Sequence, residues 1–432
     1  MQIDNFVVGL DIGTQYIKAS ALSLQDSNVM YTTTVGSQGI DKNGIADIKA
    51  LGSSISNALG KLEVKISRGI NSVFVCIQPE FVKLIETEGR VIISSGVVTA
   101  KDIDKAIDAA QLVTLNPDEE IIDILIPKYD VDGTVYRDPL GVNGKNLLIK
   151  TQLVTSKKDY VESLYDAVAY AEYSIAGTGL GIEAAASLLA TKSDKINGVF
   201  LVDSGANSTR VSLYKDDRIV DYDVIKLGGR NITKDISIIM NISLLEAEEI
   251  KKGFSLGELT LDEEKYTMVE DIIKARIEEI MDFVKRFIDR YESGNESSKI
   301  IIYGGGLCGF KNIKKLYKNK FNKPTNFITS DIIRDDSVFN IQSSGLAYHI
   351  INSIHYKAVV DEIVRNDELH FNQPTGNTYD DDEFLKKYRK EFLNEDESDT
   401  DDDDESDMDS ELGVKEKLNS WFTKVKNKFG NK

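Results

Sequence analysis

The chain has 432 residues, 41% of them hydrophobic, and a net charge of −19, so it is long enough for two or more cores and too acidic for nonspecific nucleic-acid binding. Its two cysteines, Cys76 and Cys308, exclude a disulfide framework, and three histidines are too few to favour a histidine-based metal site. No apolar run approaches the length of about 18 residues that a membrane-spanning helix needs.

Strands and helices alternate along most of the chain, which predicts an α/β fold. Short apolar runs predict strands at 6–11, 16–24, 72–77, 199–203, 211–214, 219–225 and 300–303. Apolar residues spaced three and four apart predict helices at 48–62, 161–173, 243–252 and 272–291. From residue 367 onward, few apolar residues and high charge predict disorder, with a short helix at 383–393.

One pattern occurs twice. The first strand ends at Asp11 and turns through Gly13 and Thr14 into a return strand. Some 190 residues later, Asp203 ends another apolar strand and Gly205 opens the same kind of turn. The repetition predicts two related α/β halves that face each other.

These turns have the composition of a phosphate site. A glycine turn between two strands allows backbone N–H groups to point into one concavity that binds phosphate oxygens. Thr14 or Thr209 can add a hydroxyl donor, and Lys18 can place a cation over the phosphates. Asp11 and Asp203 can hold the waters of a Mg²⁺ ion. Two such turns are expected to clamp one nucleotide from both sides.

A glycine run at a third strand end, 304–306, offers bare backbone against which an adenine can pack. Each piece alone has a plainer interpretation, because a lone Asp-x-Gly-Thr is usually a turn and a lone glycine run is usually a loop. The glycines at 177–181 have the wrong spacing for a dinucleotide fingerprint, and we expect a loop there. The combination of all three strand ends predicts nucleotide binding.

The order of these turns resembles the phosphate and adenosine motifs of the actin and sugar-kinase superfamily. Three stretches are similar to the bacterial cell-division family FtsA: 126–156, then 227–237 with 247–255, and the basic C-terminus. The resemblance spans about residues 6–360 and the C-terminal tail. It implies an actin-like (ribonuclease H-like) fold of duplicated domains, a small inserted domain, ATP and Mg²⁺.

The resemblance also assigns roles to individual residues. Asp11 and Asp203 would hold Mg²⁺ through water, and Glu248 with Lys252 or Lys251 would approach the ribose and adenine. The complete nucleotide-binding set is Asp11, Gly13, Thr14, Gln15, Lys18, Asp203, Gly205, Ala206, Asn207, Ser208, Thr209, Gly228, Gly229, Glu248, Lys251, Lys252, Gly304, Gly305 and Gly306.

Glu183 is the candidate catalytic residue, because the superfamily polarises the attacking water from this part of the chain. The alternative is a glutamate that stabilises a helix N-terminus through the helix dipole. The resemblance implies that ATP is bound tightly and hydrolysed slowly at most.

The expected domain limits follow the same resemblance. They are 1–86 for subdomain 1A, completed by 157–196 and 338–366; 87–156 for the inserted subdomain 1C; 197–226 with 300–337 for 2A; 227–299 for 2B; 367–411 for an acidic linker; and 412–432 for a terminal helix.

Two partner surfaces are implied. The inserted domain would contact the next copy of the chain head to tail and build a filament, although it could simply be a small packing module. Arg276 lies in the predicted helix 272–291 and is the position expected to bind the C-terminal peptide of FtsZ, the tubulin-like division protein. The plainer interpretation of this helix face is solvation.

The C-terminus carries opposite charges side by side. Residues 395–411 hold 12 acids and no bases, whereas residues 412–432 carry a net charge of +5. On a helical wheel the terminal segment has one apolar arc with lysines at its edges, which predicts a helix on an anionic membrane surface. A helix that binds a partner protein is the alternative. The expected membrane-contacting residues are Val414, Leu418, Trp421, Phe422, Val425, Phe429, Lys417, Lys424 and Lys428.

The sequence thus predicts an ATP-binding division protein that polymerises, tethers FtsZ to the cytoplasmic face of the membrane at the septum and contacts other division proteins. An actin-like pilus-assembly protein and a small-molecule kinase of the same superfamily are the alternatives.

Overall fold

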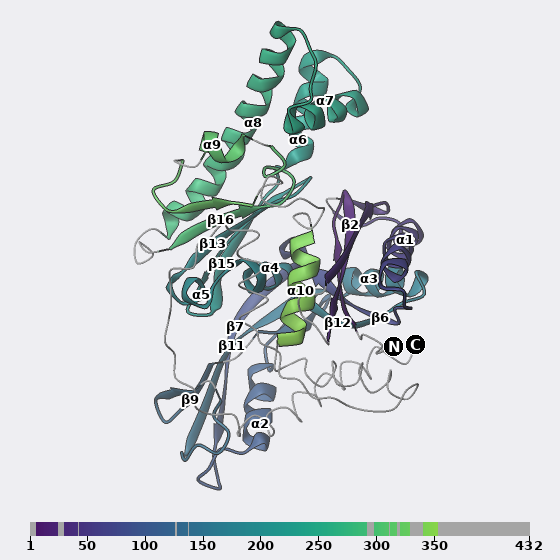
Figure 1. Ribbon diagram of the computed structural model, residues 1–432. Coiled ribbons are helices and arrows are strands. Elements are labelled where there is room, and N and C mark those ends of the chain that lie inside the picture. The colour runs from purple at the N-terminus through teal and green to yellow at the C-terminus, as the bar shows by residue number, and fades with distance from the viewer. Residues whose placement is uncertain are drawn as a thin grey trace.

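The computed structural model describes residues 6–24, 30–41, 43–125, 128–136, 138–291, 298–310, 312–317, 320–328 and 340–352. Within them, two α/β halves pack side by side, and a third, smaller sheet projects from one of them (Figure 1). No helix in these ranges is long and apolar enough to cross a membrane.

The first half is built on the sheet β12-β6-β1-β2-β3. Its strands are β1 (Phe6–Ile12), β2 (Tyr16–Ser23), β3 (Met30–Gly36), β6 (Ser72–Ile77) and β12 (Ser174–Leu180). The first three strands form an antiparallel meander, and β6 and β12 add in parallel. Helices α1 (Ile48–Ile66) and α3 (Lys158–Tyr170) cover one face, and α4 (Gly181–Leu189) and α10 (Ile341–Asn352) cover the other (Figure 1). A small ribbon of β4 (Ile40–Asp41) and β5 (Gly44–Ile45) precedes α1.

The second half repeats this topology in the sheet β15-β14-β13-β16-β17. Its elements are α5 (Lys192–Asn197), β13 (Val199–Ser204), β14 (Thr209–Lys215), β15 (Arg218–Ile225), α6 (Gly229–Met240), α7 (Leu244–Leu256), α8 (Glu263–Arg290), β16 (Lys299–Tyr303), α9 (Ile313–Tyr317) and β17 (Thr325–Phe327). An antiparallel meander again comes first and the later strands pair in parallel. The repeated strand order confirms the predicted duplication.

The inserted domain lies at the opposite end of the molecule from α6, α7 and α8 (Figure 1). After the short helix η1 (Pro79–Phe81), its sheet contains β7 (Val82–Ile92), β8 (Glu119–Ile124), β9 (Lys128–Val131), β10 (Thr134–Tyr136) and β11 (Asn146–Lys157). Helix α2 (Ala100–Ala110) packs on β7 at Gly89, where any Cβ would lie 1.8 Å from the carbonyl oxygen of Ala106. The sheet begins at Val82 and ends at Lys157, so the predicted limits 87–156 cut through β7.

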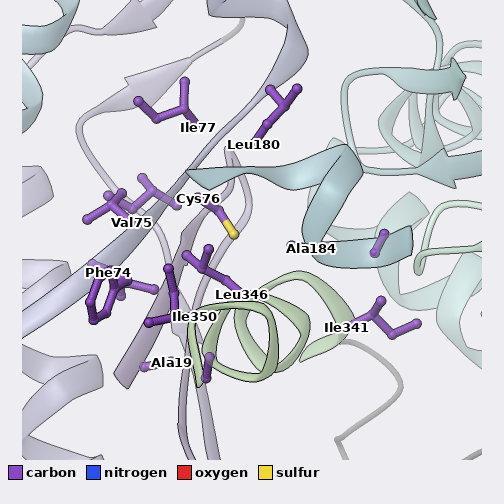
Figure 2. Close-up of a cluster of buried hydrophobic side chains, with 14 of the residues drawn as sticks. Ala19, Phe74, Val75, Cys76, Ile77, Leu180, Ala184, Ile341, Leu346 and Ile350 are labelled. Carbon is purple, nitrogen blue, oxygen red and sulfur yellow. The ribbon is translucent and has the colours of Figure 1, made fainter. Parts of the chain in front are cut away.

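Helix α10 links the end of the described chain to its beginning. Figure 2 shows Leu346 and Ile350 of α10 facing the side chains of β6, beside Ala184 of α4. The contact is close because Gly9 of β1 leaves no side chain in the way: a Cβ there would lie 2.1 Å from the carbonyl oxygen of Ser343. Gly345 permits the same approach to Ala184.

Two local predictions were wrong. The glycines at 177–181 do not form a loop, because residues up to Leu180 pair with β6 as a strand. Helix α7 passes through Gly253 and ends at Leu256, where Gly257 adopts a left-handed φ of 70°. The predicted helix at 383–393 and the terminal segment 412–432 lie outside the described residues.

Candidate nucleotide-binding cleft

The two predicted phosphate turns have matching geometry. The Gly13 N–H donates to the carbonyl of Tyr16 at 3.0 Å, and the Gly205 N–H donates to the carbonyl of Ser208 at 2.9 Å. In each hairpin, the aspartate at the end of the first strand lies opposite a residue of the return strand in register. The two turns therefore share one hydrogen-bond pattern, and each half contains one of them.

A cation stands opposite each aspartate. Lys18 Nζ lies 3.0 Å from Asp11 Oδ2, and an Arg210 guanidinium nitrogen lies 2.6 Å from Asp203 Oδ2. Sequence reasoning found Lys18 but missed Arg210. The signal was present, because lysine and arginine each follow their aspartate by seven positions.

The turns face each other across the boundary between the halves. Asn207 of the second turn donates its amide N–H to Thr14 Oγ1 of the first at 2.9 Å. Ser208 donates to Glu80 Oε1 at 2.7 Å, and Glu80 follows β6 in the first half. The structure therefore brings together the two turns that the sequence proposed as one site.

Two buried glutamines connect the aspartates, and neither was predicted. Gln78 Nε2 donates to Asp11 Oδ1 and to Gln342 Oε1, both at 2.7 Å, and Gln342 Nε2 donates to Asp203 Oδ2 at 2.9 Å. Gln78 directly follows the strand β6, so its place at a strand end was a usable signal. Gln342 opens α10, and only the tertiary fold reveals its position.

Arg210 also holds Glu80. Its Nε lies 2.9 and 2.8 Å from the two carboxylate oxygens of Glu80. Burial alone would raise the pKa of Glu80, but the guanidinium and the hydrogen bond from Ser208 outweigh it and lower that pKa. Glu80 is therefore ionised at neutral pH, and the ion pair joins the two halves.

Glycine backbones form the wall of the cleft in the second half. The Gly229 N–H donates to the carbonyl of Gly205 at 3.0 Å, and the Gly306 N–H donates to the carbonyl of Ser204 at 2.7 Å. Gly304 adopts a φ of 92°, which favours glycine, and a Cβ there would lie 2.5 Å from the same Ser204 carbonyl. Gly205 differs, because a Cβ there would meet only one atom, at 3.4 Å.

The positions expected near the nucleoside form one polar cluster. Lys251 Nζ lies 2.6 Å from Glu248 Oε2 and donates to the carbonyl of Gly229 at 3.2 Å. Burial would raise the pKa of Glu248, but hydrogen bonds from Lys251 and Thr233 lower it instead. Lys252 turns outward and pairs with Glu249 at 3.3 Å. Of the two lysines that the resemblance left open, Lys251 is the one beside the glycine wall.

The remaining predicted residues lie at the turns themselves. Gln15 and Ala206 lie in the two turns, and their backbone carbonyls accept hydrogen bonds. The carbonyl of Gln15 accepts from the Ser37 N–H at 2.9 Å, and that of Ala206 accepts from the Arg230 N–H at 2.8 Å. Thr209 donates to the carbonyl of Leu227 at 2.9 Å and is fully buried. Gly228 packs on Ala206, and Gly305 is exposed.

Glu183 lies in a different environment. Burial raises its pKa to about 8, with a further increase from Asp123 of the inserted domain and from Asp217, partly opposed by Lys195. These neighbours belong to β8, to the β14–β15 turn and to α5, and not to the two phosphate turns. The charged groups that act on Glu183 thus lie outside the two phosphate turns, and its water-polarising role stays a prediction.

Arg276 is already engaged within its own domain. Its Nε lies 2.6 Å from Asp235 Oδ2, its second nitrogen donates to Asp235 Oδ1 at 3.0 Å, and it also pairs with Glu279. The guanidinium thus joins α8 to α6. Its side chain is 23% exposed, and the predicted contact with an acidic peptide stays a prediction.

The two aspartates lie beside a turn that leaves space for a phosphate chain. A Cβ at Gly205 would meet only the Ser208 carbonyl, at 3.4 Å, so the turn leaves space for phosphate oxygens. Both Asp11 oxygens accept from Gln78 and Lys18, and Asp203 Oδ2 accepts from Arg210 and Gln342. No group of three potential metal ligands occurs in the described part of the chain. Each carboxylate keeps lone pairs that can accept hydrogen bonds from the waters of a Mg²⁺ ion, so the predicted contact through water stays a prediction.

Known proteins resemble this chain in sequence. Residues 200–347 match the family described as "Cell division protein FtsA", and residues 80–155 match the "SHS2 domain inserted in FTSA". The cell division protein FtsA of Bacillus subtilis is 30% identical over 308 residues, which cover 66% of this chain and 70% of that relative. FtsA of Neisseria meningitidis is 26% identical over 345 residues, covering 75% and 83%.

Solved structures share the fold. A chain of the PilM–PilN type IV pilus biogenesis complex has a TM-score of 0.57 at 15% identity and covers 80% of this chain and 99% of its own. The ethanolamine utilization protein EutJ of Carboxydothermus hydrogenoformans has a TM-score of 0.50 at 15% identity, covering 79% and 89%. At such identities the likeness shows the fold alone. Together with the duplicated halves, the inserted domain and the paired turns, the sequence matches show that this chain belongs to the FtsA family of cell division proteins and has the actin-like fold.

Proposed function

We propose that this chain binds ATP in the cleft between its two halves. The observation that carries the proposal is the pair of matching hairpin turns, joined across the cleft by the 2.9 Å contact between Asn207 and Thr14. That contact closes the space between the turns, so a phosphate chain entering there must replace it. The space beside Gly205 and the glycine wall at Gly306 would then face the phosphates and the nucleoside.

Slow turnover follows from the groups at the bottom of the cleft. The carboxylates of Asp11 and Asp203 each pair with a cation and accept from an amide, and the side chains between them are the amides of Gln78 and Gln342. An amide can orient a water molecule but cannot take its proton as a general base. ATP would therefore serve as a bound structural ligand that is hydrolysed slowly.

The substitution Gly205→Val tests this site. It should lower ATP affinity at least about tenfold, because a side chain would fill the space left for phosphate oxygens while its Cβ meets only the Ser208 carbonyl, at 3.4 Å. The matched control is Gly60→Val on α1, where a Cβ meets nothing within 4 Å. Calorimetric titration of the full chain with ATP gives both affinities. Equal affinities in the two variants would remove the phosphate site from this turn.

We propose further that the chain assembles with copies of itself through the inserted domain. That domain has large apolar side chains that are exposed among the described residues: Ile92 is 77% exposed, Leu112 86% and Val135 66%. A contact between this end of one copy and a different surface of the next continues without closing and builds a filament. Leu112→Glu should abolish pelleting of the chain in ultracentrifugation with ATP. Unchanged pelleting would mean that this surface makes no contact between copies of the chain.

The division role rests on family membership. We infer that the chain recruits FtsZ filaments through their acidic C-terminal peptide to the cytoplasmic face of the membrane at the septum, alongside other division proteins. The terminal apolar arc with flanking lysines supports the membrane contact. Trp421 is the only tryptophan, so its emission should shift to the blue when anionic liposomes are added. Trp421→Glu should prevent both the shift and the co-sedimentation of FtsZ with liposomes.

The pilus-assembly and kinase alternatives have less support. Both share the actin-like architecture, which the likeness to the pilus complex also reflects. Neither accounts for the matches to FtsA in both the inserted domain and the second half.

A further inference from the structure

We propose that the inserted domain holds the second phosphate turn in position through Glu80, which makes Glu80 a positioning residue for the nucleotide. The inference rests on the proposed binding of ATP and goes beyond it, because it makes the ATP affinity of the cleft depend on how a separate domain is attached. The observation that carries it is a series of contacts that leads from the second turn to Glu80 and then along β7 and β15.

Glu80 holds the return strand of the second turn by two side chains. Its Oε1 accepts from the Ser208 hydroxyl at 2.7 Å, and its two carboxylate oxygens lie 2.9 and 2.8 Å from Arg210 Nε. The same guanidinium lies 2.6 Å from Asp203, so the carboxylate is also connected to the strand that enters the turn. Because the side chain of Glu80 is only 20% exposed, these charge-assisted hydrogen bonds are partly shielded from water. One carboxylate thus fixes the geometry of this side of the turn.

The element that carries Glu80 leads directly into the inserted domain. Glu80 lies in η1, and β7 begins two residues later at Val82. The residue between them, Phe81, stacks on Tyr160 of α3, with ring centroids 4.2 Å apart and an angle of 14° between the rings. In Figure 1, β7 and its partner β11 run together into the inserted domain. Since a single residue separates Glu80 from β7, a shift of that strand displaces the carboxylate.

A seam of contacts joins the inserted domain to β15, and its residues are Val82, Glu86 and Gln152 on one side and Tyr222, Arg218 and Ile219 on the other. The Tyr222 hydroxyl donates to the carbonyl of Val82 at 2.8 Å. Farther from the cleft, Arg218 lies 2.8 Å from Glu86, and this exposed pair contributes little to stability. The hydroxyl of Tyr222 is therefore the contact that holds the start of β7, next to Glu80.

The far end of the seam is buried. Gln152 lies opposite Glu86 in the register of β11 and β7, and its Nε2 donates to the carbonyl of Ile219 at 2.9 Å. Gln152 is 7% exposed and Ile219 is fully buried, so breaking this hydrogen bond would leave polar groups without a partner in the interior. The inserted domain is thus attached to the second half, although the chain enters and leaves it from the first half.

The seam makes ATP affinity and the attachment of the inserted domain depend on each other. A turn that is already fixed loses less conformational freedom when a ligand binds, so holding Glu80 in place raises the affinity for ATP. Linkage requires the reverse effect as well, and bound ATP must stabilise the seam by the same factor. Tyr222 therefore acts on the nucleotide through Glu80, although its hydroxyl donates to the carbonyl of Val82.

The test is calorimetric titration of the full-length chain with ATP, at a temperature at which circular dichroism shows every variant to be folded. Tyr222→Phe removes one hydroxyl of the seam and should weaken ATP binding about two- to tenfold. Glu80→Ala removes the anchor itself and should weaken binding by about tenfold or more. The matched control is Tyr317→Phe, which removes a hydroxyl that α9 donates to the Lys274 carbonyl of α8 at 3.4 Å and should leave the affinity unchanged.

A double variant separates this positioning role from general destabilisation. In a chain that already carries Glu80→Ala, Tyr222→Phe should cause no further loss of ATP affinity, because the link through which it acts is gone. Equal affinities of Tyr222→Phe and the wild type, or additive losses in the double variant, would overturn the inference. If Glu80→Ala fails to fold, Gln152→Leu at the far end of the seam should weaken ATP binding as Tyr222→Phe does, and an unchanged affinity would overturn the inference. Absence of ATP binding by the wild type would instead overturn the proposed function.

Discussion

Glu183 offers a direct comparison of a catalytic and a structural role. Its pKa is raised from 4.5 to about 8, first by burial and then by Asp123. Below pH 4.5 the carboxyl is neutral in the folded and the unfolded chain and has no effect on stability. As the pH rises from 4.5 towards 8, only the unfolded chain ionises, so the free energy of unfolding falls. At pH 7 the loss is at most about 3 kcal/mol, since each unit of pKa difference corresponds to about 1.4 kcal/mol.

Glu183→Gln removes this loss because glutamine stays neutral. The variant should melt at a higher temperature than the wild type at pH 8 and at nearly the same temperature at pH 4.5, as measured by thermal unfolding across that range. Glu162→Gln, on the exposed face of α3, is the matched control and should give a flat difference. A melting difference that does not grow with pH would refute the burial argument. ATP turnover abolished by Glu183→Gln would instead restore the catalytic role.

Three further predictions concern the cleft and its supports. Glu80→Gln should lower the free energy of unfolding at pH 7 by about 1–3 kcal/mol, measured by urea titration. Because the pKa of Glu80 is lowered in the folded chain, its ionised carboxylate stabilises the fold only at higher pH, and the difference between variant and wild type should vanish as the pH falls below 4.5. Arg276→Ala should lower the free energy of unfolding by about 1–2 kcal/mol and leave ATP affinity unchanged, because it removes the ion pair between α8 and Asp235 of α6. Weakened FtsZ binding at unchanged stability would contradict this. Gly9→Ala should lower the free energy of unfolding by about 3 kcal/mol or more, measured by thermal unfolding, because the new Cβ would lie 2.1 Å from the Ser343 carbonyl oxygen and α10 would have to move away. Unchanged stability would mean that α10 shifts at little cost in free energy.

The sequence predicted those parts of the site whose residues are close together along the chain. Asp11 and Gly13 lie within three residues of each other in a strand and its turn, so the local hairpin alone places them side by side. Local spacing also identifies Arg210, because it follows Asp203 in the second hairpin by the same number of residues that separates Lys18 from Asp11. Gln342 could not be found this way, since it reaches Asp203 only after the fold has brought residues 139 positions apart together.

Side-chain direction was the second limit. Arg276 lies on the helix that the sequence predicted and Glu183 lies in the first turn of α4, but which way a helical residue points depends on the rotation that packing imposes. The strand β12 was missed for a related reason: its glycines have no side-chain signal, and pairing with β6 determines its conformation.

The position of α10 has a consequence for the newly made protein. The strand β1 is among the first segments to leave the ribosome, yet the helix that seats against Gly9 and carries Gln342 to Asp203 begins only at Ile341. Until that helix has been synthesised, the first half lacks one of its covering layers and the two aspartates lack their amide link. A growing chain therefore cannot complete the cleft, and nucleotide binding is postponed until nearly all of the folded body exists.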